Sequence, residues 1–220
     1  MILILNLSHN RHSPGPSIQA ILQELSSSSL ASFNDGDFTD RDFLHGLLHE
    51  YRPKIVLNCV EYDDCDGAEF ERERAYAINA FSLKSLSDLC KEQDALLVHL
   101  STSLVFDGSR PAPYGEDDGP CPETVYGDSK LLGERIIAES GCRHLIIRVT
   151  DLFGQNIPFF SRRLTSVDGE GHLRVIKGQF ISPGYSADLA RAILELTGRS
   201  CEGLYHFSQG GPVATVDFMA

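Results

Sequence analysis

Short apolar runs alternate with amphipathic helical patterns along most of this chain. The clearest runs, at 54–60 and 95–100, are almost continuously apolar, which is typical of strands buried on both faces of a parallel sheet. Similar runs at 2–5 and 144–148, and a weaker one at 30–33, extend the pattern. The segments between these runs carry helical periodicity, as crossover connections between parallel strands require. The sequence therefore predicts an α/β fold, a Rossmann-like, doubly wound parallel sheet covered by helices.

The helices have recognisable ends. One helix is predicted to begin after an N-cap at Thr39, with Asp40 and Asp42 beside the positive end of its dipole, and to stop before Pro53. A single long helix is predicted over 68–90. Two further helices are predicted at 17–25 and 187–196.

Composition narrows the class of protein. A length of 220 residues with 42% hydrophobic content suits one globular domain, 1–220. No apolar run approaches the roughly 20 residues that cross a bilayer, and no basic region precedes the first apolar segment, so we expect neither a membrane span nor a signal peptide. The net charge of −12 argues against nucleic acid as a partner. The six cysteines form no Cys-x-x-Cys pair, which favours reduced, buried thiols and a cytoplasmic location.

Two groups of residues resemble metal ligands, and for both a simpler interpretation is preferred. His45 and His49 share one helical face, but no third ligand is evident, and a half-exposed helix face explains them. An acidic run lacks the glycine and terminal glutamate of a calcium loop, and a solvated loop at the mouth of the sheet is predicted instead. This run consists of Glu61, Asp63, Asp64 and Asp66. No metal site is predicted.

The strongest indication of chemistry is a hydroxyl residue at a strand end followed by a Tyr-x-x-x-Lys pair. Thr102 ends the apolar run at 95–100, and Tyr126 and Lys130 are spaced to stand on one face of a helix. A phenol has an unperturbed pKa of about 10, and a nearby ammonium lowers it. The pair therefore predicts Tyr126 as an acid or base, with Thr102 hydrogen-bonding the same substrate oxygen. The alternative is a surface Tyr and Lys, because this spacing alone is common by chance.

These residues resemble the extended short-chain dehydrogenase/reductase family, and within it the dTDP-4-dehydrorhamnose reductases. The resemblance includes further segments of the chain, namely 52–59, 76–80, Arg148 with Phe153-Gly154, 178–183 and 203–206. It implies reduction of a 4-keto nucleotide sugar, or a related carbonyl, with NADPH or NADH as cofactor. Tyr126 would then protonate the oxygen, Lys130 would hold the ribose, and Thr102 would orient the oxygen. An epimerase or dehydratase with the same cofactor is a weaker alternative.

The expected cofactor loop departs from the family pattern. Where the family has three glycines that let the backbone approach the pyrophosphate, only Gly15 can serve as one of them. Leu7 stands where the first glycine belongs, and the prolines on both sides of Gly15 lack backbone donors. Arg11 is predicted to supply a charged contact to the phosphates instead. A loop that no longer binds dinucleotide well is the equal alternative.

Other cofactor contacts follow from the resemblance. Asp37 and Phe38 are predicted to line the adenine pocket, and Cys59 and Val60 to flank the ribose. Asn79 matches an asparagine that orders a proton-relay water, with a helix-kinking or surface amide as the alternative.

The last part of the chain is expected to form a truncated substrate lobe. The segments 154–184 and 209–220 are predicted as its remnant, since family members continue past the motif at 213–220. We expect either an open site, or a homodimer or partner protein that covers it. The alternative function is a non-catalytic regulatory or binding protein of the same fold, similar in kind to the regulatory β subunit of methionine adenosyltransferase.

Overall fold

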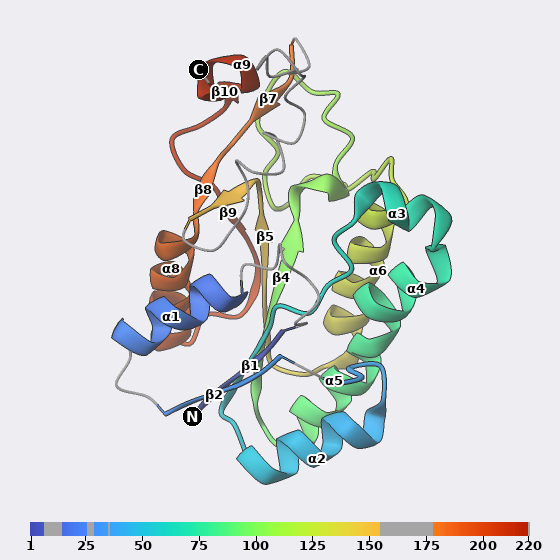
Figure 1. Cartoon of the computed structure of the whole chain (residues 1–220), viewed down its shortest axis with the longest axis vertical. Coiled ribbons are helices and arrows are strands. Elements are labelled where there is room, and N and C mark those ends of the chain that lie inside the picture. The colour runs from blue at the N-terminus through green and yellow to red at the C-terminus, as the bar shows by residue number, and fades with distance from the viewer. Residues whose placement is uncertain (7–14, 26–28, 35, 155–177, 220) are drawn as a thin grey trace, which may run out of the picture.

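The described residues form one parallel sheet with helices on both faces. The computed structural model describes residues 1–6, 15–25, 29–34, 36–154 and 178–219. Within these ranges, six strands pair in the order β2-β1-β3-β4-β5-β9 (Figure 1). Their bounds are β1 Ile2–Leu5, β2 Leu30–Phe33, β3 Ile55–Asn58, β4 Leu96–Thr102, β5 His144–Val149 and β9 Gly203–Phe207. The predicted α/β class is confirmed.

The strand order indicates where a ligand crevice is expected. All five pairings in this sheet are parallel, so the strands predicted as neighbours are neighbours, and their carboxyl ends share one edge. The chain moves from β1 outward to β2 and then returns to β3 on the other side of β1. Ligands in open α/β sheets bind at the carboxyl edge beside such a reversal. Thr102, the last residue of β4, lies at that edge as predicted.

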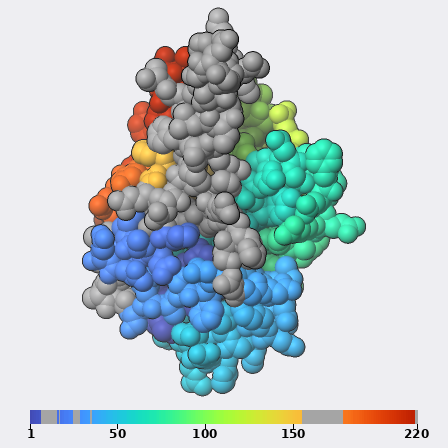
Figure 2. All heavy atoms as spheres, viewed as in Figure 1, coloured from blue at the N-terminus to red at the C-terminus, as the bar shows by residue number. Residues whose placement is uncertain are grey.

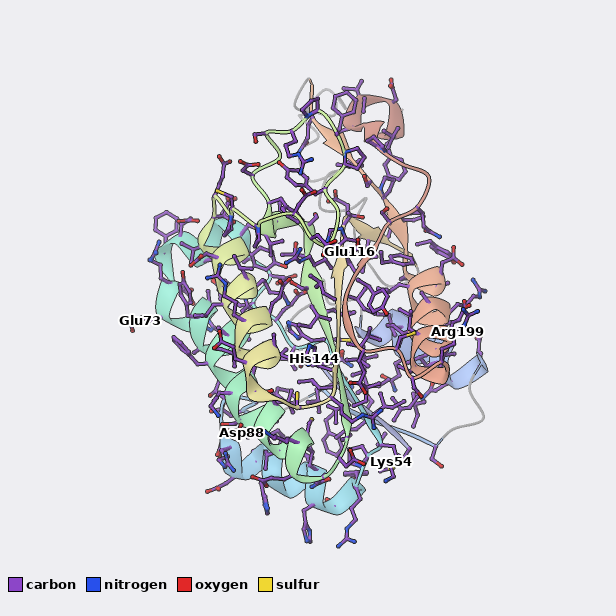
Figure 3. The ribbon with its side chains drawn as sticks, turned by 180° about the vertical axis from the view of Figure 1, so that it is seen from behind. Lys54, Glu73, Asp88, Glu116, His144 and Arg199 are labelled. Atoms are coloured by element: carbon purple, nitrogen blue, oxygen red, sulfur yellow. The ribbon has the colours of Figure 1, made fainter. Side chains whose placement is uncertain are left out.

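Alternating side chains along each strand build two hydrophobic layers. Leu3 and Leu5 face one cluster, whereas Ile2 and Ile4 face the other. The first face is covered by α2 Arg41–Tyr51, α5 Ser82–Glu92 and α6 Val125–Ser140, and the second by α1 Gly15–Leu25 and α8 Ser186–Gly198. The reverse view in Figure 3 shows α6 and α8 on opposite sides of the strands.

The long helix predicted over 68–90 is wrong in detail, because the chain breaks it into pieces. These are α3 Cys65–Phe70, α4 Arg72–Tyr76, a π-helical turn at Ala77–Phe81, and α5. Glu71 interrupts the helical path with φ −108° and ψ 44°. The π turn brings the Asn79 carbonyl against α6 at Gly133, where an added Cβ would lie 2.3 Å from that oxygen. Such turns recur at functional sites.

The predicted cap of α2 is displaced by one residue. Asp40, not Thr39, is the N-cap, and its side chain accepts a hydrogen bond from the Asp42 amide at 2.8 Å. Thr39 is drawn away because its amide and hydroxyl both donate to the Asp37 carboxylate.

Short strand pairs lie beyond the carboxyl edge of the main sheet. They are β6 Leu152–Phe153 with β8 Gly184–Tyr185, and β7 Phe180–Ile181 with β10 Val213–Ala214, followed by α9 Thr215–Met219. The space-filling view shows α1 and the α3–α4 region on opposite sides of the molecule (Figure 2). No helix among the described residues is long and apolar enough to span a membrane.

Candidate active site

A cleft opens at the carboxyl ends of β2 and β3. Its volume is about 810 Å³, within the range of small-molecule sites. Asp37, Phe38 and Val60, which sequence analysis assigned to the cofactor, line it together with Ile78 and Ser82. The Thr39 hydroxyl and amide, which hydrogen-bond the Asp37 carboxylate, lower the pKa of Asp37. The cleft therefore combines apolar walls with several acidic side chains, Asp37 among them, and one basic side chain, Arg74.

The predicted Thr102–Tyr126 pair is brought together by two short elements. After β4 ends at Thr102, a 3₁₀ turn at Ser103–Val105 passes beneath the start of α6. Thr124 caps α6 by accepting a hydrogen bond from the Gly127 amide at 3.0 Å. A Cβ on Gly127 would lie 2.2 Å from the Leu104 carbonyl oxygen, so this close contact of turn and helix requires glycine.

The Tyr126 phenol is buried, with 7% of the residue exposed. Its hydroxyl donates a hydrogen bond to Glu61 Oε2 at 3.1 Å, and the Thr102 side chain lies close enough to act on the pKa of the phenol. Burial, reinforced by the Glu61 carboxylate, raises the pKa of Tyr126 well above its usual value. The prediction of a lowered pKa is therefore wrong. The Tyr126 side chain lies in a buried cluster with Ala68 and Ala75.

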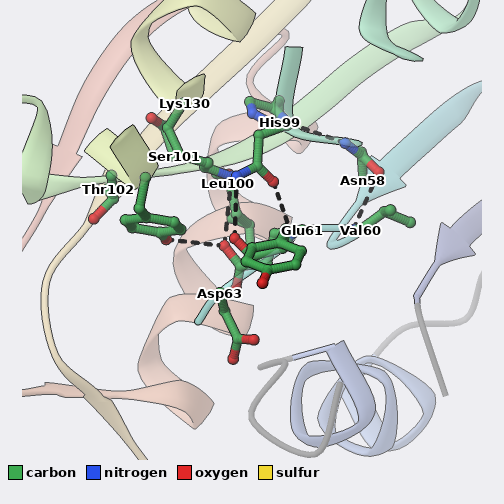
Figure 4. Close-up of polar contacts among 12 residues, drawn as sticks. Asn58, Val60, Glu61, Asp63, His99, Leu100, Ser101, Thr102 and Lys130 are labelled. Carbon is green, nitrogen blue, oxygen red and sulfur yellow. Dashed lines mark hydrogen bonds and ion pairs between the residues drawn. The ribbon is translucent and has the colours of Figure 1, made fainter. Parts of the chain in front are cut away.

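Lys130 lies one turn after Tyr126, and its side chain is 1% exposed. Its ammonium donates to the Leu100 carbonyl at 2.6 Å and lies 3.5 Å from Glu61 Oε2. Both contacts of the ammonium are with oxygens other than the Tyr126 hydroxyl (Figure 4). One carboxylate oxygen of Glu61 thus contacts both members of the predicted pair.

Glu61 is the residue that sequence analysis missed. It was assigned to a solvated acidic loop, but its side chain is only 17% exposed and lies in the site. Asp64 caps α3 by accepting from the Gly67 amide. The available signal was position: Glu61 lies three residues after the end of β3, at the same sheet edge as Thr102.

Two asparagines fix the backbone on either side of Glu61. Asn58 accepts from the Val60 amide at 3.2 Å, and its amide contacts the buried ring of His99 at 3.0 Å. Asn79 accepts from the Tyr62 amide at 2.8 Å and donates to the Tyr62 carbonyl at 3.0 Å. Asn79 is buried and is engaged with protein groups, so the structure shows it supporting the site; its role toward a water stays a prediction.

The remaining predicted cofactor residues are placed only in part. Cys59 is buried behind the cleft, and burial raises the pKa of its thiol. Gly15 begins α1. Arg11 lies outside the described residues. His45 and His49 are exposed on α2, and the described residues contain no group of three or more His, Cys, Asp or Glu placed to hold a metal ion.

A second ion pair braces α6 one turn beyond Lys130. Glu134 accepts two hydrogen bonds from Arg148, at 2.9 and 2.7 Å, and a third from Ser101 at 2.5 Å. The two charged side chains are 5% and 7% exposed. This network ties α6 to β4 and β5, and it holds the helix that carries Tyr126 against the strand that carries Thr102.

The fold and this arrangement define a class of protein, the extended short-chain dehydrogenase/reductase-like α/β proteins, as the resemblance implied. The chain belongs to the family described as the RmlD substrate binding domain, whose model matches residues 13–220.

Relatives of known sequence support this assignment. The dTDP-4-dehydrorhamnose reductase of Mycobacterium tuberculosis is 36% identical over 169 residues, covering 73% of this chain and 55% of that protein. The spore coat polysaccharide biosynthesis protein SpsK of Bacillus subtilis is 35% identical over 179 residues, covering 81% of this chain and 62% of its own. The chain thus spans about three fifths of the length of the curated relatives it matches.

A solved structure has a similar fold. The dTDP-4-dehydrorhamnose reductase of Bacillus anthracis, crystallised in complex with NADP, superposes with a TM-score of 0.89 at 30% identity, over 99% of this chain and 78% of that one.

Proposed function

We propose that this protein is an NAD(P)H-dependent reductase of a keto group on a nucleotide sugar, with dTDP-4-dehydrorhamnose as the first substrate to test. The observation that carries the proposal is the meeting of Thr102, Tyr126 and Lys130 at the carboxyl edge of the sheet. The relatives named dTDP-4-dehydrorhamnose reductase, and the one crystallised with NADP, support the substrate and cofactor classes.

The cleft fits a dinucleotide at its adenosine end. Phe38, Val60 and Ile78 offer apolar surface, and the Asp37 carboxylate is an acceptor for ribose hydroxyls. Asn6, directly after β1, is buried, and its Oδ1 has no hydrogen-bond partner within the described ranges. We propose Asp37, Phe38, Val60 and Lys130 as cofactor contacts.

Each side chain of the site has its own role in the proposed carbonyl reduction. When bound, the cofactor supplies the hydride for the carbonyl carbon. Tyr126, whose pKa is raised, carries its proton at neutral pH and can give it to the carbonyl oxygen. Thr102 orients that oxygen, and the Lys130 ammonium stabilises the phenolate that remains.

We also propose that the two short strand pairs belong to a substrate lobe. β7 lies within the segment 154–184, β6 ends directly before it, β8 begins at its last residue, and β10 lies within 209–220. Residues 155–177 lie outside the described ranges.

The second candidate, a non-catalytic protein of the same fold, is favoured by Glu61. Its carboxylate oxygen contacts both the Tyr126 hydroxyl and the Lys130 ammonium. A site that stayed in this arrangement would have neither group directed at a substrate.

A binding and turnover experiment separates the two candidates. NADH and NADPH are titrated into the purified protein by calorimetry, and cofactor oxidation is then followed with dTDP-4-dehydrorhamnose. We expect binding, and turnover that Tyr126→Phe abolishes. Absence of binding at millimolar cofactor would support the non-catalytic candidate.

A further inference from the structure

The carboxylate of Glu61 occupies a position that a ligand hydroxyl would need. Its Oε2 accepts from the Tyr126 hydroxyl at 3.1 Å and lies 3.5 Å from the Lys130 ammonium. Under the proposed function, a ribose hydroxyl must approach that same ammonium beside the same phenol. Two oxygens cannot share one position, so the carboxylate and the ligand compete for it.

Hydrogen bonds of the residues on either side of Glu61 hold it in this position. The Val60 amide donates a hydrogen bond to Asn58, and the Tyr62 backbone is hydrogen-bonded to Asn79. Both asparagines are buried, with 2% of Asn58 and 1% of Asn79 exposed. These hydrogen bonds hold the backbone on both sides of Glu61, so its displacement would be a movement of the side chain.

The charges explain why the contact forms without a ligand. The Lys130 ammonium is 1% exposed, and a buried ammonium is costly unless an anion or several oxygens face it. Glu61 supplies the anion. Glu61 also lines the cleft that Asp37 and Phe38 line, so its side chain is not enclosed by protein on every side.

We propose that Glu61 is an internal occupant of the ligand position between Tyr126 and Lys130, which dinucleotide binding must displace. Its carboxylate competes with the cofactor for this position and lowers the apparent affinity for the cofactor. This inference rests on the proposed function, because it names the dinucleotide as the competitor.

The test compares dinucleotide affinity in matched variants by calorimetric titration with NADH and NADPH. Glu61→Ala removes the competitor, and we expect binding about tenfold tighter than in the wild type, since the competent state no longer has to be selected. Glu61→Gln keeps an acceptor for Tyr126 but loses the charge facing Lys130, so its affinity should lie between the two. Glu73→Gln is the control, with the same loss of charge on an exposed α4 residue that lies outside the cleft lining and points outward in Figure 3; its affinity should be unchanged.

Thermal melting provides a readout that a merely structural role would not give. Without ligand, Glu61→Ala should melt below the wild type because Lys130 has lost its anion. Saturating dinucleotide should restore most of that difference, whereas a structural glutamate would leave it in both states.

The outcomes distinguish this inference from the proposed function. Wild-type binding combined with equal or weaker binding by Glu61→Ala overturns the inference and leaves the proposed function standing. Absence of binding by the wild type and by all three variants overturns both. Binding by Glu61→Ala alone supports the inference and counts against the proposed function, because the wild-type protein then does not bind the cofactor.

Discussion

Helix α6 takes part in two ion pairs one turn apart, through Lys130 and Glu134, and the two pairs differ in geometry and in exposure. Glu134 meets Arg148 in a two-point contact, with Ser101 donating a further hydrogen bond, and both charged side chains are at most 7% exposed. Lys130 meets Glu61 at 3.5 Å through one oxygen, and Glu61 is 17% exposed at the border of a cleft. The first pair is saturated and fixed, whereas the second is loose and open to replacement by a ligand.

The difference between the two pairs shows how α6 contributes both to stability and to the candidate active site. A planar guanidinium facing a carboxylate satisfies both partners geometrically, which suits a permanent brace. An ammonium on a flexible stem exchanges one oxygen for another at little cost. The brace holds α6 against β4, and the loose pair presents Tyr126 and Lys130 at the end of that strand.

Breaking the brace should have the largest effect. Glu134→Ala leaves the Arg148 guanidinium buried without its anion, and we expect a loss of about 3–5 kcal/mol of unfolding free energy. Urea denaturation followed by circular dichroism measures it. The double variant with Arg148→Met is the control, because removal of both charges should recover part of the loss; a small effect of the single variant would contradict the role of the brace.

Removing the Tyr126 hydroxyl tests the chemical side of the comparison. Tyr126→Phe should reduce turnover by about 10²–10⁴-fold, the usual contribution of a positioned proton donor. Its unfolding free energy should change by only about 1 kcal/mol, because a single hydrogen bond is lost. Steady-state reduction assays together with urea denaturation test both statements, and unchanged turnover would remove Tyr126 from the mechanism.

Breaking the loose pair should cost less stability than breaking the brace. For Glu61→Ala we expect a loss of about 1–2 kcal/mol, below the range for a fully buried pair, because Glu61 is partly exposed and the Leu100 carbonyl still faces Lys130. Denaturation without ligand, in the same buffer as for Glu134→Ala, measures the ratio. Equal losses for the two variants would show that the Lys130 pair is as structural as the Arg148 pair.

The smallest expected effect is a dependence of the free energy of unfolding on pH, which arises from the buried His99 near Lys130. Burial, aided by the Lys130 charge, holds the pKa of His99 well below its usual value. In acidic solution the unfolded chain therefore binds a proton at His99 that the folded protein does not bind. The free energy of unfolding is highest above about pH 6.5 and falls by up to about 1.4 kcal/mol per pH unit below it.

The control for this dependence is His99→Asn, which lacks the titrating ring. Denaturation of both proteins between neutral and mildly acidic pH should show a shallower acid slope for the variant, whatever its absolute stability. Identical slopes would mean that His99 is protonated in the folded protein.

Much of the fold was predictable from local patterns. The strands at 2–5 and 30–33 were placed at their observed bounds, and three other strands lie within a few residues of their predicted positions. Continuous apolar runs mark parallel strands because such strands are buried on both faces. The break at Glu71 and the π turn at Ala77–Phe81 escaped prediction, because the helical periodicity of the apolar residues continues through both.

The site was predictable in its members but not in its electrostatics. Thr102, Tyr126 and Lys130 were recognised from spacing, and Asp37, Phe38 and Val60 do line a cleft. The partner of Tyr126 lies 65 residues earlier in the chain, within a run whose composition resembles an ordinary acidic loop. Spacing predicted that an ammonium would act on the phenol, and the structure shows that a carboxylate acts on it instead.

The sequence by itself determined the alternation of strands and helices, the edge at which Thr102 ends its strand, and the helix that carries Tyr126 and Lys130. These features follow from local periodicity and from caps, which are written within a few residues. Only the tertiary structure decided that Glu61 stands between the two side chains and that the pKa of Tyr126 is raised. A pKa depends on burial and on distances to charges, and both are set by segments that meet only when the sheet and its helices have packed.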